Sequence, residues 1–277
     1  MSSSSKATVS SVALVALAVC GAATLAAPAN ACGRESDCAL GERSFRIALP
    51  DNDPPRGAIV YAHGHLGSAE GAMRNDALVE LAQDLNLAFV AAQGMDGMWN
   101  TPNNPGGDTR RGDELAYFDA LASALEADYG IPSERTFVSG FSSGAMLVWN
   151  LACERGDVYA GFAPLSGTFW APVPDTCPTI PNGMMHFHGT EDKIVPMEGR
   201  AIRDSRQSDI ADAFIMLENL SDYSELEKAD GGDDLTCSHR EDSAGRTFDV
   251  CYFPGGHSFR TEFFEMAAEA FLPRNSP

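Results

Sequence analysis

Basic residues are scarce in this sequence. The chain has 277 residues with 19 Lys and Arg against 39 Asp and Glu, which gives a formal net charge of −20. Proteins that bind nucleic acid or dock on anionic membranes carry basic patches, so the deficit argues against both kinds of partner. Complete disorder is also excluded, because 44% of the residues are hydrophobic and can supply a core.

After its first 31 residues the chain lacks any apolar stretch long enough to span a membrane. Residues 1–31 contain no Asp or Glu, Lys6 is their only charge, and residues 12–27 are nearly all apolar. The small-x-small sequence A-N-A at 29–31 follows, and this pattern is typical of a secretory signal peptide. A membrane anchor is the alternative, but an Ala-rich run of 16 residues is short for a bilayer. We therefore predict cleavage after residue 31 and a mature domain at 32–277, secreted or periplasmic.

The sequence also lacks a C-x-x-C pair, the spacing typical of structural zinc sites. Seven Cys occur, and Cys20 lies in the predicted signal peptide. An even number remains, which indicates disulfides in an exported protein. We predict the pairs that close the shortest loops, Cys32–Cys38, Cys153–Cys177 and Cys237–Cys251.

Neither a repeat nor a long linker divides the mature chain, which favours a single domain. Short apolar runs alternate with amphipathic stretches, as in an α/β fold with a mostly parallel sheet and helices on both faces. The predicted strands span residues 58–62, 87–92, 136–141, 161–165, 184–187 and 248–253. The clearest helix is 113–129, with an apolar stripe of Leu115, Phe118, Ala122, Leu125 and Tyr129, and further helices are predicted at 72–85, 145–152 and 261–272.

A candidate nucleophile lies between a predicted strand and a predicted helix. Residues 140–144 read G-F-S-S-G and match G-x-S-x-G, a sharp turn that exposes the serine hydroxyl while its glycines avoid clashes. The alternative is a Ser/Gly turn with no chemistry. Ser139 and Ser143 are competing hydroxyls, but neither has a Gly two positions away on each side. The pattern favours Ser142.

A serine nucleophile needs a base and an acid that orients the base. His257 lies in a Gly-rich loop after a predicted strand and is the candidate base. Asp192 follows another strand and is the candidate acid, with the adjacent Glu191 as its rival. His239 lies in a charged segment, where we expect it to be exposed. The predicted catalytic residues are Ser142, Asp192 and His257.

Acyl transfer also requires backbone N–H donors for the negative oxygen of the intermediate. We predict the N–H of Ser143, which follows the nucleophile, and that of His65, in the loop after strand 58–62. Leu66 is the alternative to His65.

Two H-x-H pairs, His63 with His65 and His186 with His188, raise the alternative of a zinc site. Strand alternation gives the same spacing, and no nearby acid completes a familiar set of ligands. A packed structural role suits His186 and His188 better. We expect no metal ion and no cofactor.

Four motifs together resemble a known family: H-G-x-x-G-S at 63–68, G-x-S-x-G at 140–144, G-T-x-D-x-x-V-P at 189–196 and G-G-H at 255–257. In this order they resemble the secreted polyhydroxybutyrate depolymerase and feruloyl esterase group of α/β-hydrolases, over roughly residues 57–260. The resemblance implies an α/β-hydrolase fold and the same catalytic serine, acid and base. It also implies that Trp99 and Asn100 belong to the substrate cleft.

These observations predict a serine esterase that acts on carboxylic esters, in the manner of a polyhydroxybutyrate depolymerase. The alternatives are a feruloyl or acetylxylan esterase and a non-catalytic binding protein on the same fold. The substrate is an ester, polymeric or soluble. Because the chain is strongly acidic, a neutral ester should approach more readily than a polyanion.

Overall fold

The computed structural model describes Met1 and residues 32–52, 54–105, 113–229, 231–232 and 234–272. The predicted signal peptide at 1–31 therefore lies outside the described residues, apart from Met1. The chain from Cys32 onward forms one compact unit, which contains every element described below.

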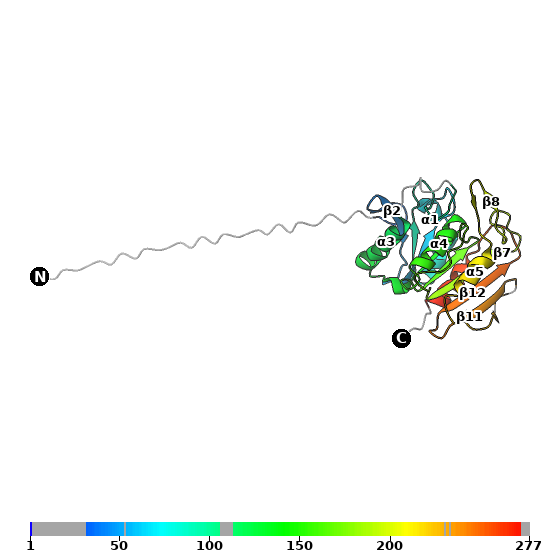
Figure 1. Cartoon of the computed structure of the whole chain (residues 1–277). Helices are drawn as coiled ribbons and strands as arrows, with labels where there is room; N and C mark the ends of the chain where they lie inside the picture. Colours follow the sequence, from blue (N-terminus) through cyan, green and yellow to red (C-terminus); the bar gives the residue numbers. More distant parts are fainter. Residues whose placement is uncertain (2–31, 53, 106–112, 230, 233, 273–277) are drawn as a thin grey trace. The chain divides into compact units, whose positions relative to one another are not determined.

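The central strands of the fold are parallel and run through the middle of the molecule (Figure 1). They are β3 (Gly57–Ala62), β4 (Leu87–Ala92), β5 (Thr136–Phe141), β6 (Gly161–Leu165), β7 (Gly183–Gly189) and β12 (Thr247–Phe253). Strands that pair antiparallel extend both margins: β1 (Cys38–Leu40), β2 (Arg43–Ala48), β10 (Glu227–Ala229) and β11 (Thr236–Glu241). Within the described residues, these strands form a ten-stranded sheet in the order β1-β2-β4-β3-β5-β6-β7-β12-β11-β10.

Helices cover both faces of this sheet. One face carries α3 (Glu114–Tyr129), α4 (Ser143–Glu154) and α5 (Ile210–Glu218), and the other carries α1 (Ala69–Met73), α2 (Asp76–Asp84) and α6 (Glu262–Phe271). Strand β3 shows why both faces are covered: Val60 packs with the first group, while Ile59 and Tyr61 pack with the second. The predicted α/β architecture with a mostly parallel sheet is confirmed.

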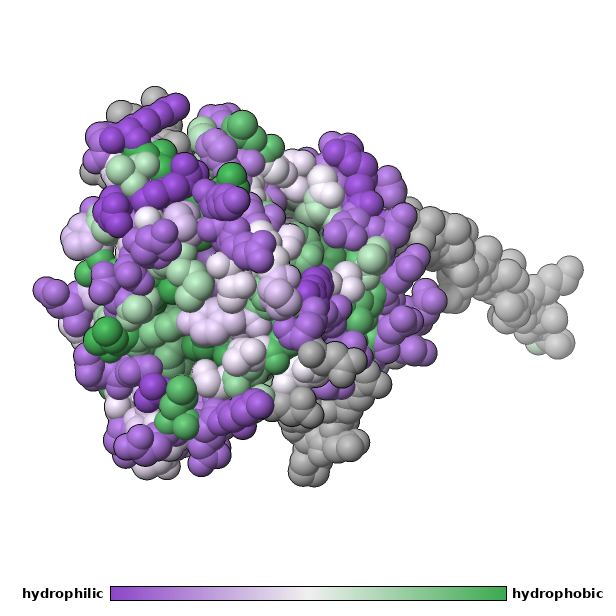
Figure 2. All heavy atoms as spheres, turned by 90° about the vertical axis from the view of Figure 1, so that its right-hand side faces the viewer, coloured by the Kyte–Doolittle hydropathy of each residue, from purple (hydrophilic) through white to green (hydrophobic). Residues whose placement is uncertain are grey.

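The six strands predicted from the sequence are the six parallel strands, within one or two residues at their ends. The sequence did not reveal the marginal strands or the small hairpin of β8 (Ala201–Ile202) and β9 (Ser205–Arg206). It also did not reveal the 3₁₀ turn η2 (Ser133–Arg135) and helix α5. The parallel strands are buried on both faces and are therefore continuously apolar, whereas the margins carry polar residues that hide the pattern. Polar residues cover most of the face presented in Figure 2, with apolar residues in small groups between them.

Two helix predictions need correction. The helix predicted at 72–85 is two helices, α1 and α2, because Asn75 interrupts it and its side chain caps α2 by accepting the N–H of Leu78. In α3 the buried face is rotated from the predicted stripe and includes Tyr117 and Leu121. Leu115, Ala122 and Tyr129 are only half-buried.

The rotation of α3 has a polar cause. The hydroxyl of Tyr117 donates to the carbonyl oxygen of Ser44 at 2.7 Å, and the carboxylate of Glu114 accepts from Arg43 at 2.9 Å. These partners let a phenol and a charged group lie in the buried face, where hydrophobicity alone does not place them.

The structure contains the three disulfides predicted from the spacing, Cys32–Cys38, Cys153–Cys177 and Cys237–Cys251. The last joins residues directly opposite each other on β11 and β12. Three disulfides fit an extracellular protein. No helix among the described residues has the length and apolar character needed to cross a membrane.

Candidate active site

Ser142 lies at the turn where β5 ends and α4 begins. Its backbone has a φ of 58° and a ψ of −118°, a conformation rarely adopted by residues with a side chain. The turn is fixed on both sides, because the N–H of Ser142 donates to the carbonyl of Leu165 and its carbonyl accepts the N–H of Met146. This strained turn presents the hydroxyl of Ser142 at the carboxyl end of the parallel sheet.

The two glycines that flank this turn are required by close backbone contacts. A Cβ atom on Gly140 would lie 2.6 Å from the carbonyl oxygen of Gly144. On Gly144 it would lie 2.1 Å from the carbonyl oxygen of Ala62 on β3. The G-x-S-x-G sequence thus reflects the tight packing of the turn against the neighbouring strand.

The structure brings the three predicted catalytic side chains into one hydrogen-bonded chain. The Oγ of Ser142 lies 2.9 Å from Nε2 of His257, and Nδ1 of His257 lies 2.7 Å from Oδ2 of Asp192. Asp192 is buried, while Ser142 and His257 are partly accessible. A hydroxyl, an imidazole and a buried carboxylate in this order can transfer a proton from the serine to the imidazole.

Two backbone hydrogen bonds join the loop that carries Asp192 to the loop that carries His257. The N–H of Thr190 donates to the carbonyl of Phe253 at 2.9 Å, and the N–H of Glu191 donates to that of Gly255 at 2.8 Å. Gly189 permits this approach, because a Cβ there would lie 2.4 Å from the carbonyl oxygen of Gly256. The side chain of Glu191, the predicted rival of Asp192, is exposed.

Asp192 is held as a carboxylate. Burial alone would raise its pKa, but hydrogen bonds from His257 and from the N–H groups of Val195 and Ile194 outweigh burial and lower the pKa below its ordinary value. The two N–H groups contact Oδ1 of Asp192, and Oδ2 accepts from His257. A negative charge is therefore fixed beside the imidazole, where it favours the imidazolium form.

The two predicted N–H donors lie beside Ser142. Among the described residues, neither the N–H of Ser143 nor that of His65 has a hydrogen-bond partner. Ser143 begins α4, whose amino end carries a partial positive charge. The N–H of Leu66, the alternative to His65, donates to the carbonyl of Gly97 at 2.8 Å and is thus engaged.

The loop that carries His65 is shaped by its buried neighbour His63. The N–H of Gly94 donates to Nε2 of His63 at 3.0 Å, so the proton of this imidazole lies on Nδ1, which donates to the carbonyl of Gly64 at 2.8 Å. Burial lowers the pKa of His63 and keeps its ring neutral. The indole of Trp99 packs against this ring at a tilt of 34° and donates to the carbonyl of His63 at 2.7 Å.

The second H-x-H pair lies behind Asp192. His186 and His188 are buried side by side, with Nε2 of His186 3.1 Å from Nδ1 of His188. The remaining nitrogens contact the indole of Trp149 and the carbonyl of Val195. Within the described residues, no three His, Cys, Asp or Glu side chains form a group that could hold a metal ion.

Of the competing residues, Ser139 and His239 have structural partners, whereas the buried Oγ of Ser143 has none among the described residues. The hydroxyl of Ser139 is buried and donates to the carbonyl of Ala163 at 2.7 Å. The expectation that His239 is exposed was wrong: it is half-buried, and its Nδ1 lies 2.8 Å from the carboxylate of Asp249 on the next strand. Burial raises the pKa of Asp249.

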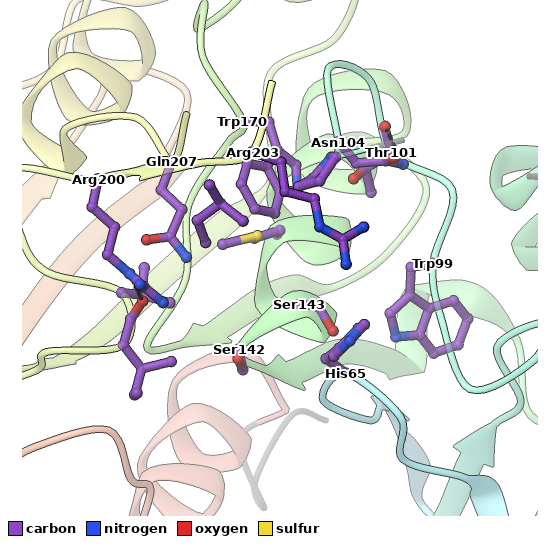
Figure 3. A pocket seen from close by; sticks show the side chains of 15 residues that line it. His65, Trp99, Thr101, Asn104, Ser142, Ser143, Trp170, Arg200, Arg203 and Gln207 are labelled. Carbon is purple, nitrogen blue, oxygen red and sulfur yellow. Dashed lines mark hydrogen bonds between the residues drawn. The ribbon is translucent and has the colours of Figure 1, made fainter. Parts of the chain in front are cut away.

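A cavity of about 250 Å³ opens beside Ser142 (Figure 3). Apolar and aromatic side chains form much of its wall, among them Trp99, Met146 and Trp170, and His65 and Ser143 lie at its edge. Mostly apolar walls with a few polar groups are typical of sites for small molecules.

The two residues expected in the substrate cleft have different places. Trp99 lines the cavity, but it is 3% exposed and also packs against His63. Asn100 is not among the lining residues, and its N–H donates to the carboxylate of Glu114 at 2.8 Å. The salt bridge between Arg43 and Glu114, neither of which lines the cavity, therefore supports this loop.

Sequence reasoning missed most of the cavity wall. Met146 could have been found, because it is one helical turn after Ser142. Asn104, Trp170, Arg203 and Gln207 come from separate loops and the β8–β9 hairpin, and no spacing in the sequence indicates that they meet.

Comparisons with known proteins agree with this architecture. A family model described as Phospholipase/Carboxylesterase matches residues 116–220. The protein NocK of Nocardia uniformis is 28% identical over 185 residues, which cover 62% of this chain and 52% of that protein. Feruloyl esterase C of Emericella nidulans is 24% identical over 168 residues, 58% of either chain. The chain thus spans about half to two thirds of the length of these relatives.

Among solved structures, the acetyl xylan esterase of Aspergillus awamori superposes with a TM-score of 0.61 at 14% identity, over 83% of this chain and 94% of that one. The protein has the α/β-hydrolase fold. Its similarity to a feruloyl esterase-like group of this superfamily confirms the feruloyl esterase part of the resemblance found in the motifs.

Proposed function

We propose that the protein is an exported serine esterase in which Ser142, His257 and Asp192 hydrolyse carboxylic esters through an acyl-enzyme. The observation that carries the proposal is the continuous hydrogen-bonded chain from the Ser142 hydroxyl to the buried Asp192, next to an open cavity. The similarity to esterases supports the same reaction class.

In the first half of the reaction, Nε2 of His257 takes the proton of Ser142 as Oγ attacks the ester carbonyl carbon. The N–H groups of Ser143 and His65 receive the negative oxygen of the tetrahedral intermediate. His257 then gives its proton to the leaving alcohol, and the C–O bond of the ester breaks. In the second half, water loses a proton to His257, attacks the acyl-enzyme, and the proton returns to Ser142 as the acid leaves. These reaction steps require no cofactor.

The decisive test compares Ser142→Ala with Ser123→Ala, a serine on the exposed side of α3. We expect Ser142→Ala to abolish hydrolysis of 4-nitrophenyl acetate and labelling by a fluorophosphonate, whereas Ser123→Ala retains both. Full activity in Ser142→Ala would contradict the assignment. A correctly folded wild-type protein that neither reacts with the fluorophosphonate nor hydrolyses esters would favour the non-catalytic binding protein.

Two substrate classes remain in competition. The feruloyl esterase relatives favour plant polysaccharide esters, and the motif pattern also fits a polyhydroxybutyrate depolymerase. Release of product from feruloylated xylan, acetylated xylan and polyhydroxybutyrate film separates them. We expect the greatest activity on the feruloylated or acetylated polymer.

Export through cleavage after Ala31 is part of the same proposal. The three disulfides support it, because they need an oxidising compartment. The mass and amino-terminal sequence of the protein recovered from the culture medium or periplasm should identify Cys32 as the first residue.

A further inference from the structure

The cavity beside Ser142 differs in charge from the rest of the protein. The chain carries 39 acidic residues, yet none of the 15 described residues that line the cavity is Asp or Glu. Two of them, Arg200 and Arg203, are cationic. A site of this composition favours an anionic ligand at contact, even though the whole protein repels anions at long range.

Arg203 is unusual among the arginines of the structure. Every other arginine in the described part of the chain has a hydrogen-bond or carboxylate partner, whereas the side chain of Arg203 has neither. Arg200, its neighbour in the wall, donates to the carbonyl of Ile194. The guanidinium of Arg203 therefore has all of its donors available.

The backbone holds Arg203 in place over the cavity. Arg203 lies in the short turn between β8 and β9, with a φ of 55°, a region that favours glycine. Its guanidinium points into the cavity, toward the side where Ser143, His65 and Trp99 lie (Figure 3). Keeping an arginine in this strained position is consistent with a function for its side chain.

Two buried amide oxygens in the same wall also lack partners, as does the buried Oγ of Ser143. The Oε1 atom of Gln207 and the Oδ1 atom of Asn104 have no hydrogen bond, although these residues are only 3% and 4% exposed. A buried acceptor without a donor costs free energy, so each is suited to a hydroxyl supplied by a ligand. The wall thus offers free donors on Arg203 and free acceptors on Gln207 and Asn104.

We propose that this cavity is a subsite for a substrate portion that carries a carboxylate together with hydroxyl groups, the chemistry of a hydroxy acid or an acidic sugar. The carboxylate pairs with Arg203, and the hydroxyls donate to Gln207 and Asn104. Met146 and Trp170 pack against the carbon skeleton. The inference rests on the proposed esterase function, because it concerns which ester reaches Ser142.

Three small methyl esters test the subsite by pH-stat titration: methyl butyrate, monomethyl succinate and monomethyl tartrate. Methyl butyrate and monomethyl succinate differ in the carboxylate. Monomethyl succinate and monomethyl tartrate differ in the hydroxyl groups. Arg203→Gln should raise the KM of monomethyl succinate relative to that of methyl butyrate about fivefold, as for an exposed ion pair. Gln207→Met should raise the KM of monomethyl tartrate relative to that of monomethyl succinate by about the same factor.

Arg206→Gln is the matched control, because Arg206 lies on the same hairpin and outside the cavity wall. It should leave both KM ratios at their wild-type values. Arg203→Gly removes the charge while accepting the positive φ, so it replaces Arg203→Gln if the latter folds poorly. Unchanged ratios in the Arg203 and Gln207 variants would overturn the subsite while leaving the esterase assignment intact. A wild-type protein that hydrolyses none of the three esters, nor 4-nitrophenyl acetate, would instead contradict the proposed function.

Discussion

The indole N–H of Trp149, on α4, donates to Nδ1 of His186, on β7, over 3.3 Å. An indole can only donate, so Nδ1 of His186 carries no proton and the neutral ring bears its proton on Nε2. That proton is donated to Nδ1 of His188. His188 must then carry its own proton on Nε2, which donates to the carbonyl of Val195 at 2.8 Å. One indole thus fixes both tautomers and supports the loop that holds Asp192.

Replacing His188 tests this support. In His188→Leu, the carbonyl of Val195 and the Nε2–H of His186 lose their partners, which should reduce the free energy of unfolding by about 1–3 kcal/mol. The kcat for 4-nitrophenyl acetate should fall as well, because Val195 donates to the carboxylate of Asp192. In His188→Gln the side-chain amide can still donate to Val195, so more of both properties should be retained. Urea denaturation and kcat measure the two effects, and equal behaviour of the two variants would contradict the role of this donor.

The buried histidines also predict how stability depends on pH. Burial lowers the pKa of His186 and His188 from the ordinary 6.5, and His186 is affected most. As pH falls below 6.5 the unfolded chain takes up protons on these rings while the folded chain does not, so the free energy of unfolding decreases. Each histidine contributes a slope of at most about 1.4 kcal/mol per pH unit. Urea titrations between pH 8 and 5 should show this decline, with a smaller slope in His188→Gln, and a flat profile would contradict it.

Asp192 and Glu191 are adjacent acids with different environments. Replacing each by its amide, Asn or Gln, therefore distinguishes their functions. Asp192→Asn should lower kcat by about 10⁴, because the amide favours the wrong tautomer of His257 and cannot stabilise the imidazolium. Glu191→Gln removes an exposed charge and should change kcat little. Steady-state kinetics on 4-nitrophenyl acetate measures both, and a greater loss in Glu191→Gln would reverse the assignment of the acid.

The close packing around the Ser142 turn predicts a strong effect of one methyl group. Gly144→Ala would place Cβ 2.1 Å from the carbonyl oxygen of Ala62, so β3 or α4 must shift. We expect a loss of several kcal/mol of stability, or failure to fold, as for severe overpacking. In Gly33→Ala, the new Cβ would meet only the carbonyl oxygen of Ile47 at 3.8 Å, and thermal denaturation should be nearly unchanged. Wild-type stability in Gly144→Ala would show that the turn can relax.

The sequence predicted the parts of the fold that hydrophobicity controls. The strand at 87–92 is apolar throughout and buried on both faces, and its predicted ends agree with β4. The marginal strand at 236–241 reads T-C-S-H-R-E, and its place depends on pairing with β12, which no local pattern encodes. The buried face of α3 was misplaced because Glu114 is buried through a partner 71 positions away.

The candidate site likewise has one part that the local sequence predicts and another part that only the tertiary structure reveals. Ser142, Asp192 and His257 could be selected because glycine-rich turns after strands mark the places where chemistry gathers in an α/β sheet. The wall of the cavity could not be predicted, since Asn104, Trp170 and Arg203 are brought together only by the tertiary fold. The tautomers of His186 and His188 likewise depend on Trp149, 37 positions before His186.

If the protein is exported as proposed, the disulfide between Cys32 and Cys38 bears on the order of events during export. If cleavage follows Ala31, Cys32 becomes the first residue of the processed chain, and its partner emerges only six positions later. Both sulfurs lie near the hydroxyl of Tyr129 at the end of α3, at 3.5 and 3.8 Å. This bridge can close while most of the chain is still in transit, before the cysteines of the other two pairs have crossed. Once the domain is complete, the disulfide links the new amino terminus to β1. An aminopeptidase would therefore meet a first residue that is covalently bonded to the folded domain.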